Sequence, residues 1–187
     1  MTLTVKEWRI DKSWTLFLDR DGVINERNFE GYITSPNQFK FKAGVFDALE
    51  IFNDLFDKKI LVTNQQGVAK KIMSERNLNE VHRYMSQELK SNINFEFDAI
   101  FTATNRRGAE NDRRKPNKSM ALEAKEMYPS IDFGKSIMIG DTDSDIKFGT
   151  NLGMKAVLVN SNEIVTVKPD VTVDNLKEFA LILNRIK

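Results

Sequence analysis

Short apolar runs and longer amphipathic segments alternate along the chain. Apolar runs of strand length predict five buried strands and a short sixth, at 14–18, 60–62, 97–102, 136–139, 155–159 and 171–173. Apolar residues at helical spacing predict helices at 43–58, 74–90, 117–127 and 176–186, with a short helix that ends at 152. Alternating strands and helices predict an α/β fold: a doubly wound, three-layer, Rossmann-like parallel sheet with right-handed crossovers.

Two segments lack a clear period and are predicted to be loops. The first, at about 25–42, contains Gly31 and Pro36 and is interpreted as a flap over the end of the first strand, with Tyr32 and Phe39 as its packing residues. The second, the basic loop at about 103–118, is rich in arginine. Neither leaves spare length for a separate cap domain, so we expect one domain over 1–187.

Composition excludes several classes of protein. The chain has 187 residues, 41% of them hydrophobic and 29% charged, which is typical of a soluble globular domain. Its formal net charge of +1 gives no general reason to expect nucleic acid or a membrane as partner. No signal peptide or membrane span is predicted, so we expect a cytoplasmic protein, with a monomer favoured. With no cysteine and one histidine, His82, any metal must be held by oxygen. We expect His82 to lie at the edge of the buried stripe of its helix.

Polar clusters follow three of the predicted strands: Asp19 with Asp21, Thr63 with Asn64, and Asp141 with Asp145. An Asp-x-Asp pair on its own favours a solvated acidic turn. The carboxyl ends of parallel strands, however, lie at one edge of a sheet, where α/β proteins bind ligands. Three coincident clusters therefore favour a catalytic edge.

Carboxylates without histidine or cysteine indicate a Mg²⁺ site. An ionised aspartate beside a metal can act as a nucleophile, and a second can act as general acid and then base. Asp21 would need a raised pKa to act as an acid near neutrality. Lys115 could neutralise an anionic intermediate, and Thr63 could offer its hydroxyl to an oxyanion. Phosphoryl transfer through an aspartyl-phosphate is the reaction class that suits these parts.

Four segments together resemble the ordered motifs of the haloacid dehalogenase superfamily of phosphatases: 19–25, 62–67, 114–116 and 139–145. The similarity is greatest to the branch of heptose-bisphosphate and histidinol-phosphate phosphatases, because of Gly31-Tyr32-Ile33 and the Thr-Asn-Gln and Arg-Lys-Pro sequences. It spans about 14–159.

The resemblance implies a role for each matched residue. Asp19 would be the nucleophile and a Mg²⁺ ligand, Asp21 the general acid and base with its carbonyl on the metal, and Asp141 the remaining metal ligand. Thr63 and Lys115 would hold the phosphoryl oxygens, and Asp145 would orient ligands or waters. Substrate contacts are implied at Glu30, Gly31, Tyr32, Asn64, Gln65, Gln66 and Arg114.

Two departures from the family pattern bear on the substrate. Many members hold a structural zinc with cysteines and a histidine before Arg-Lys-Pro, whereas 104–113 contains neither, so no zinc is expected. Thr142 stands where heptose phosphatases often carry a lysine.

The expected partner is a small phosphorylated metabolite, such as D-glycero-D-manno-heptose 1,7-bisphosphate. Histidinol phosphate and a polynucleotide 3′-phosphate remain alternatives. The balanced charge makes a nucleic-acid partner the less favoured of these. A response-regulator receiver would place its acidic pair and phosphorylated aspartate on different strands, and a catalytically inactive binding module would not need every motif residue.

Overall fold

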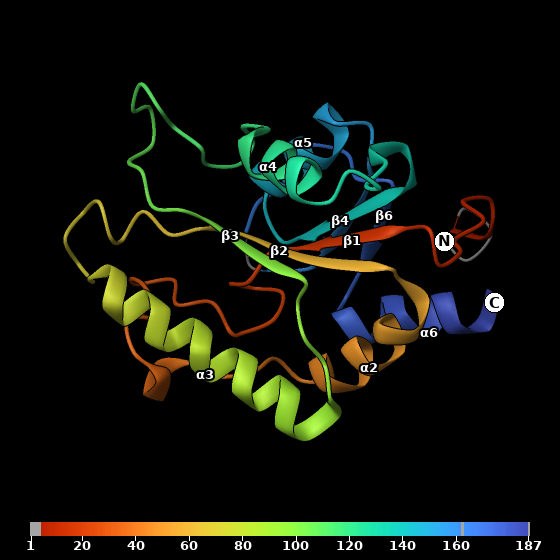
Figure 1. Ribbon diagram of the computed structural model, residues 1–187, viewed down its shortest axis with the longest axis horizontal. Coiled ribbons are helices and arrows are strands. Elements are labelled where there is room, and N and C mark those ends of the chain that lie inside the picture. The colour runs from red at the N-terminus through yellow and green to blue at the C-terminus, as the bar shows by residue number, and fades with distance from the viewer. Residues whose placement is uncertain (1–4, 162, 187) are drawn as a thin grey trace.

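A sheet of six parallel strands lies at the centre of the protein (Figure 1). The computed structural model describes residues 5–161 and 163–186. Its strands are β1 (Thr15–Leu18), β2 (Lys58–Asn64), β3 (Ala99–Ala103), β4 (Ser136–Gly140), β5 (Lys155–Val159) and β6 (Val171–Val173). Their order in the sheet is β3-β2-β1-β4-β5-β6, and every neighbouring pair is parallel. The predicted doubly wound sheet is confirmed.

Helices cover both faces of this sheet (Figure 1). They are α2 (Val45–Leu55), α3 (Glu75–Ile93) and α6 (Leu176–Ile186) on one face, and α4 (Ser119–Met127) and α5 (Asp143–Asn151) on the other. Two 3₁₀ turns, η1 (Pro36–Gln38) and η2 (Phe133–Lys135), lie in the connections. Successive strand residues point to opposite faces, so Leu16 and Leu18 join the larger apolar cluster while Phe17 joins the smaller one. None of the described helices is long and apolar enough to cross a membrane.

Local chemistry sets most of the element boundaries. Ser74 caps the start of α3, as its side chain and that of Asn77 accept hydrogen bonds from each other's backbone N–H groups. The same helix ends at Ile93, three residues beyond the predicted stop, where Asn94 at φ 50° caps it. Strand β2 is longer than predicted, because Lys58 and Lys59 pair with β1 although their side chains are polar.

The predicted flap is a loop whose two ends are joined. The N–H of Glu26 donates to the carbonyl of Lys40 (2.8 Å), and the N–H of Lys42 donates to the carbonyl of Ile24 (3.0 Å). Phe39 is buried as predicted, but the second buried apolar residue is Ile33. Tyr32, predicted as a packing residue, is only half-buried. The described chain contains no separate cap domain, so this loop is what overhangs the sheet edge.

The strand order reverses beside β1, since β2 and β3 lie on one side of it and β4 to β6 on the other. Loops on either side of such a reversal leave in opposite directions and open a crevice at the carboxyl ends of the strands. Asp19 follows β1 and Asp141 follows β4, so both acids stand at the reversal.

Candidate active site

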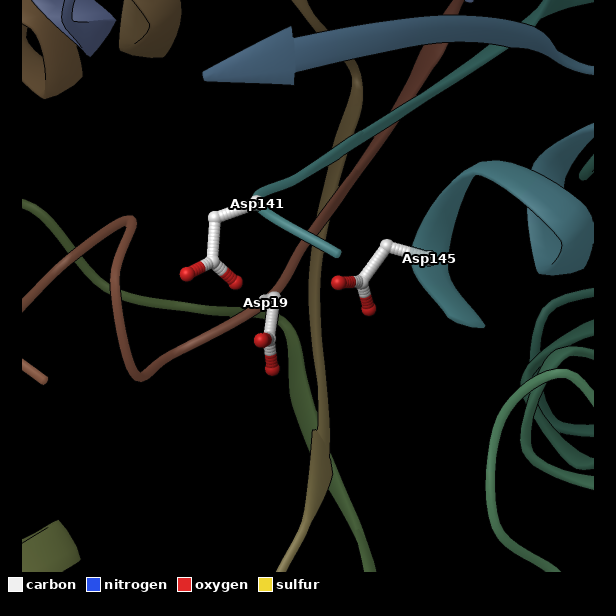
Figure 2. A group of neighbouring side chains, drawn as sticks. All are labelled: Asp19, Asp141 and Asp145. Carbon is white, nitrogen blue, oxygen red and sulfur yellow. The ribbon is translucent and has the colours of Figure 1, made fainter. Parts of the chain in front are cut away.

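Three buried carboxylates converge where β1, β4 and α5 meet (Figure 2). The N–H of Asp19 donates to the carbonyl of Ile139 (2.9 Å), which continues the β1–β4 pairing one residue past β1. Asp19, Asp141 and Asp145 each offer one oxygen, and these oxygens lie within 4.8 Å of one another. Asp19 is 8% exposed and the other two are fully buried.

Two glycines make this approach possible. A Cβ at Gly22, which has φ +90°, would lie 2.1 Å from Oδ2 of Asp141. A Cβ at Gly140 would lie 2.1 Å from the Cβ of Asp145. Since real Cβ contacts of that length do not occur, any larger residue at either position would displace a carboxylate of the cluster.

Lys115 supplies the positive charge of the cluster. Its buried Nζ lies 2.8 Å from Asp19 Oδ1 and 2.7 Å from Asp145 Oδ1, and donates to the carbonyl of Val62 (2.6 Å). Burial acts to lower the pKa of Lys115, but the two carboxylates outweigh it and raise the pKa. Lys115 is therefore a permanent cation held between Asp19 and Asp145.

The other charged groups of the cluster are carboxylates. Because they are buried close together, Asp19 and Asp141 are harder to ionise than a carboxyl group in water. Burial, together with Asp145, Asp141 and Asp21, raises the pKa of Asp19 to about 7 in spite of Lys115. Burial and Asp145 raise the pKa of Asp141 to about 6 in spite of Arg27. A group of carboxylates with raised pKa values is a site that a bound cation would stabilise.

The donor set fits a magnesium ion. Oδ1 of Asp141 is buried and has no hydrogen-bond partner among the described residues. All ligand atoms are oxygens, which Mg²⁺ prefers. Of the predicted ligands, Asp19 and Asp141 have their side chains in the cluster. The side chain of Asp21 lies outside it, so the predicted ligand from Asp21 is its backbone carbonyl. Asp145 is the third carboxylate instead, and its Oδ2 already accepts from the N–H and hydroxyl of Thr142.

Asp21 has a different environment from the cluster. Its Oδ1 accepts from Arg20 Nη2 and Asn25 Nδ2 (both 3.0 Å), and its Oδ2 accepts from Gln65 Nε2 (2.7 Å). Burial acts to raise the pKa of Asp21, but Arg20 and the hydrogen bonds from Asn25 and Gln65 outweigh it and lower the pKa. The raised pKa that an acid role requires is therefore not a property of the unliganded site.

A cavity of about 420 Å³ opens over these residues. Its walls come from the sheet edge, the flap, the loop after β2, the basic loop and the start of α5, with two residues from the loop after β5. The lining residues are Asp19, Asp21, Arg27, Asn28, Phe29, Gly31, Tyr32, Ile33, Asn64, Gln65, Gln66, Arg107, Arg114, Lys115, Thr142, Asp143, Ser144, Asp145, Glu163 and Ile164. This size suits a small ligand.

Most of the predicted substrate residues line this cavity, with different freedom to bind. Gln66 and Arg114 face it, but both polar atoms of the Asn64 side chain are bonded to the backbone of Lys115, at 2.9 and 3.2 Å. Glu30 is exposed and is not among the residues that line the cavity, so the implied substrate contact at this position stays a prediction. Thr63 is fully buried beneath Gln65, whose Nε2 donates to its hydroxyl (2.9 Å).

Charged side chains attach the basic loop to its surroundings. Arg113 forms an ion pair with Glu123 of α4. The carboxylate of Asp112 accepts from the N–H groups of Gly108 and Arg114, both at 2.9 Å. Arg106 donates to the carbonyl of Ala69 (3.3 Å), which attaches the loop to the segment after β2. Charged side chains thus hold the loop.

Sequence reasoning missed three residues at the site. Arg27 of the flap donates to Asp141 Oδ2 (3.1 Å) and lies 3.4 Å from Glu163. No local pattern marks either residue, because the loops that carry them meet only in the folded protein. The third residue, Arg20, lies between Asp19 and Asp21 in the first motif. A charged residue between two acids at the end of a buried strand is a signal that could have identified it.

Comparison with known proteins places this site in a family. Residues 112–179 match the model of the HAD-hydrolase-like family. The chain is 32% identical over 165 residues to D-glycero-β-D-manno-heptose-1,7-bisphosphate 7-phosphatase of Helicobacter pylori (strain J99), covering 88% of this chain and 93% of that protein. It is 30% identical over 183 residues to D-glycero-α-D-manno-heptose-1,7-bisphosphate 7-phosphatase of Mycobacterium bovis, covering 96% of each.

A solved structure agrees with the fold. D,D-heptose 1,7-bisphosphate phosphatase from B. bronchiseptica, complexed with magnesium and phosphate, superposes with a TM-score of 0.82 at 23% identity, over 92% of this chain and 99% of that one. The chain belongs to the haloacid dehalogenase-like hydrolases, in the branch that contains the heptose-1,7-bisphosphate 7-phosphatases.

Proposed function

We propose that the protein is a Mg²⁺-dependent phosphomonoesterase that acts on a small sugar phosphate, with D-glycero-D-manno-heptose 1,7-bisphosphate as the favoured substrate. The observation that carries the proposal is Lys115 Nζ, held at 2.8 Å from Asp19 and 2.7 Å from Asp145 beneath a cavity that also contains Asp21. Curated relatives of near-equal length act on the two anomers of that bisphosphate.

In the proposed mechanism Asp19 attacks phosphorus, and the bond from phosphorus to the ester oxygen breaks. Asp21 gives its proton to the departing alkoxide, and then takes a proton from the water that hydrolyses the aspartyl-phosphate. Lys115 keeps Asp19 oriented and balances charge on the phosphoryl oxygens. The low pKa of Asp21 does not preclude the acid role. A bound phosphate dianion places a negative charge beside Asp21, and this charge raises the pKa of its carboxyl group.

Asp19 and Asp141 would hold the Mg²⁺, together with the backbone carbonyl of Asp21. When bound, the ion supplies charge neutralisation for the transferred phosphoryl group. No stoichiometric zinc is expected, because 104–113 offers neither thiolate nor imidazole and is held by Arg113, Asp112 and Arg106 instead.

Charge at the cavity mouth supports a bisphosphate. Arg114 is half-buried in the wall; burial and the nearby charge of Arg107 lower its pKa in spite of Asp112. Neither guanidinium forms an ion pair with a described residue, so a second phosphate group would relieve their mutual repulsion.

A phosphate-release screen tests the proposal. It compares both anomers of the heptose bisphosphate with histidinol phosphate and a 3′-phosphorylated oligonucleotide, with Mg²⁺ and with chelator. We expect the bisphosphate to give the highest kcat/KM, and turnover to stop in chelator and in Asp19→Asn. Substantial residual turnover by Asp19→Asn would sink the aspartyl-phosphate mechanism, and a preference for the oligonucleotide that falls steeply with salt would identify a polynucleotide phosphatase.

A further inference from the structure

A fully buried arginine lies next to the proposed general acid. Arg20 is 0% exposed and is the largest of the completely buried side chains. It follows Leu16 and Leu18 at alternate positions, so it points to the sheet face that α3 covers. Its Nη2 donates to Asp21 Oδ1 (3.0 Å) and lies within ion-pair distance of no other described carboxylate.

His82 of α3 holds the other side of this guanidinium. The His82 Nε2 lies 3.1 Å from Arg20 Nη1. Burial and the charge of Arg20 lower the pKa of His82 to about 3, so the imidazole is neutral at any ordinary pH and its Nε2 accepts the hydrogen bond. The helix itself is fixed by Val81 and Met85, which flank His82 in the core.

This arrangement is a poor way to gain stability. A buried guanidinium loses its hydration, and apolar residues of similar volume stabilise a protein as well or better. Its Nε also has no hydrogen-bond partner among the described residues. What the planar guanidinium does provide is a rigid link, because fixing one nitrogen on His82 fixes the other against Asp21.

We propose that Arg20 and His82 are a positioning pair for Asp21: His82 orients the buried Arg20, and Arg20 fixes the Asp21 carboxyl group so that its free lone pairs face the cavity and the departing ester oxygen. Neither residue touches the substrate. This inference rests on the proposed function, and it predicts that the pair matters in proportion to how much the leaving group needs a proton.

Two aromatic monoesters of similar size provide the test. 4-Nitrophenyl phosphate has a stable leaving anion that needs little protonation, whereas benzyl phosphate releases an alkoxide that does. His82→Asn shortens the side chain so that no acceptor reaches Arg20, and His82→Gln places an amide oxygen close to the position of Nε2. Asp21→Asn gives the full effect of losing the acid, and Arg83→Leu, exposed one residue along α3, serves as the surface control.

We expect His82→Asn to lower kcat/KM for benzyl phosphate by about 10- to 100-fold, because misplacing a positioned acid forfeits part of its contribution. The loss for 4-nitrophenyl phosphate should stay below about 3-fold, and His82→Gln should recover most of the activity on the benzyl ester. Should His82→Asn not fold, His82→Leu makes the same comparison with a volume closer to that of histidine.

Equal losses on the two esters, or no loss in a folded His82→Asn protein, would overturn the inference while leaving the proposed function intact. If the wild-type protein hydrolyses neither ester and releases no phosphate from the sugar bisphosphate with Mg²⁺ present, the proposed function fails, and the positioning pair fails with it. A loss in His82→Asn that His82→Gln does not restore would also count against the pair, since the hydrogen bond to Arg20 would not be the cause.

Discussion

Replacing Asp19 by asparagine is expected to stabilise the metal-free protein at alkaline pH. Asp19 is 8% exposed and shares its surroundings with Asp141 and Asp145, and the pKa of its carboxyl group is raised from 3.8 to about 7. An acid whose pKa is raised on folding makes its full contribution to stability below the unfolded value, and that contribution is lost as the pH rises through the folded value. The ionised Asp19 therefore opposes folding at pH 8, and a neutral amide does not.

The size of the effect follows from these values. A rise from 3.8 to about 7 spans about three pKa units, which is at most about 4 kcal/mol at pH 8. The attraction between Lys115 and the ionised carboxylate is already contained in the pKa of about 7, so it is not subtracted again. Half of this upper limit, about 2 kcal/mol, would raise the Tm by about 4–8 °C for a chain of this length.

Thermal unfolding in chelator, at pH 8 and again at pH 5, measures the difference. The advantage of Asp19→Asn should shrink by more than half at pH 5, where the folded wild-type carboxyl is largely protonated. Adding Mg²⁺ at pH 8 should raise the Tm of the wild type far more than that of the variant. The control is Asp54→Asn, an exposed carboxylate on α2, which should change little at either pH. A variant that is no more stable than the wild type at pH 8 in chelator would refute the reasoning.

Three further outcomes are expected. Arg114→Ala should weaken kcat/KM for a sugar bisphosphate by about 1.5–3 kcal/mol and affect an aryl phosphate much less; equal losses would mean that Arg114 serves the transferred phosphoryl group. Gly22 has φ +90°, and Gly22→Ala places a methyl group 2.1 Å from Asp141 Oδ2. The variant should therefore lower Tm by at least about 4 °C and abolish the stabilisation by Mg²⁺; a retained stabilisation by Mg²⁺ would contradict this reasoning. Elemental analysis should find no stoichiometric zinc, because 104–113 contains neither cysteine nor histidine; one tightly held zinc ion per chain would contradict this expectation.

The sequence by itself determined the layers and the edge of the sheet that carries the chemistry. Apolar runs of strand length separated by amphipathic segments specify a parallel sheet, and parallel strands bring their carboxyl ends together whatever the loops do. The positions of Asp19, Thr63 and Asp141 at one edge were therefore predictable from spacing. Boundaries were predicted less well, because pairing with a neighbour extends β2 to the polar Lys58 and Lys59.

Only the tertiary structure decided which side chains at that edge meet. The distances from Lys115 to Asp19 and Asp145 depend on how the basic loop returns across β2, and Asn64 fixes that return through the backbone of Lys115. The acid role requires a raised pKa at Asp21, but in the folded protein this pKa is lowered, because the charge of Arg20 and the hydrogen bonds from Asn25 and Gln65 outweigh burial.

The partner of Arg20 illustrates the general limit of sequence reasoning here. His82 is 62 residues away along the chain, and its spacing on α3 indicates only that it borders a buried stripe. Periodicity specifies the face of a helix on which a residue lies, since that depends on neighbours three and four positions away. Which group lies opposite that face depends on how the helix packs on the sheet, and this is settled by the shapes of many side chains at once.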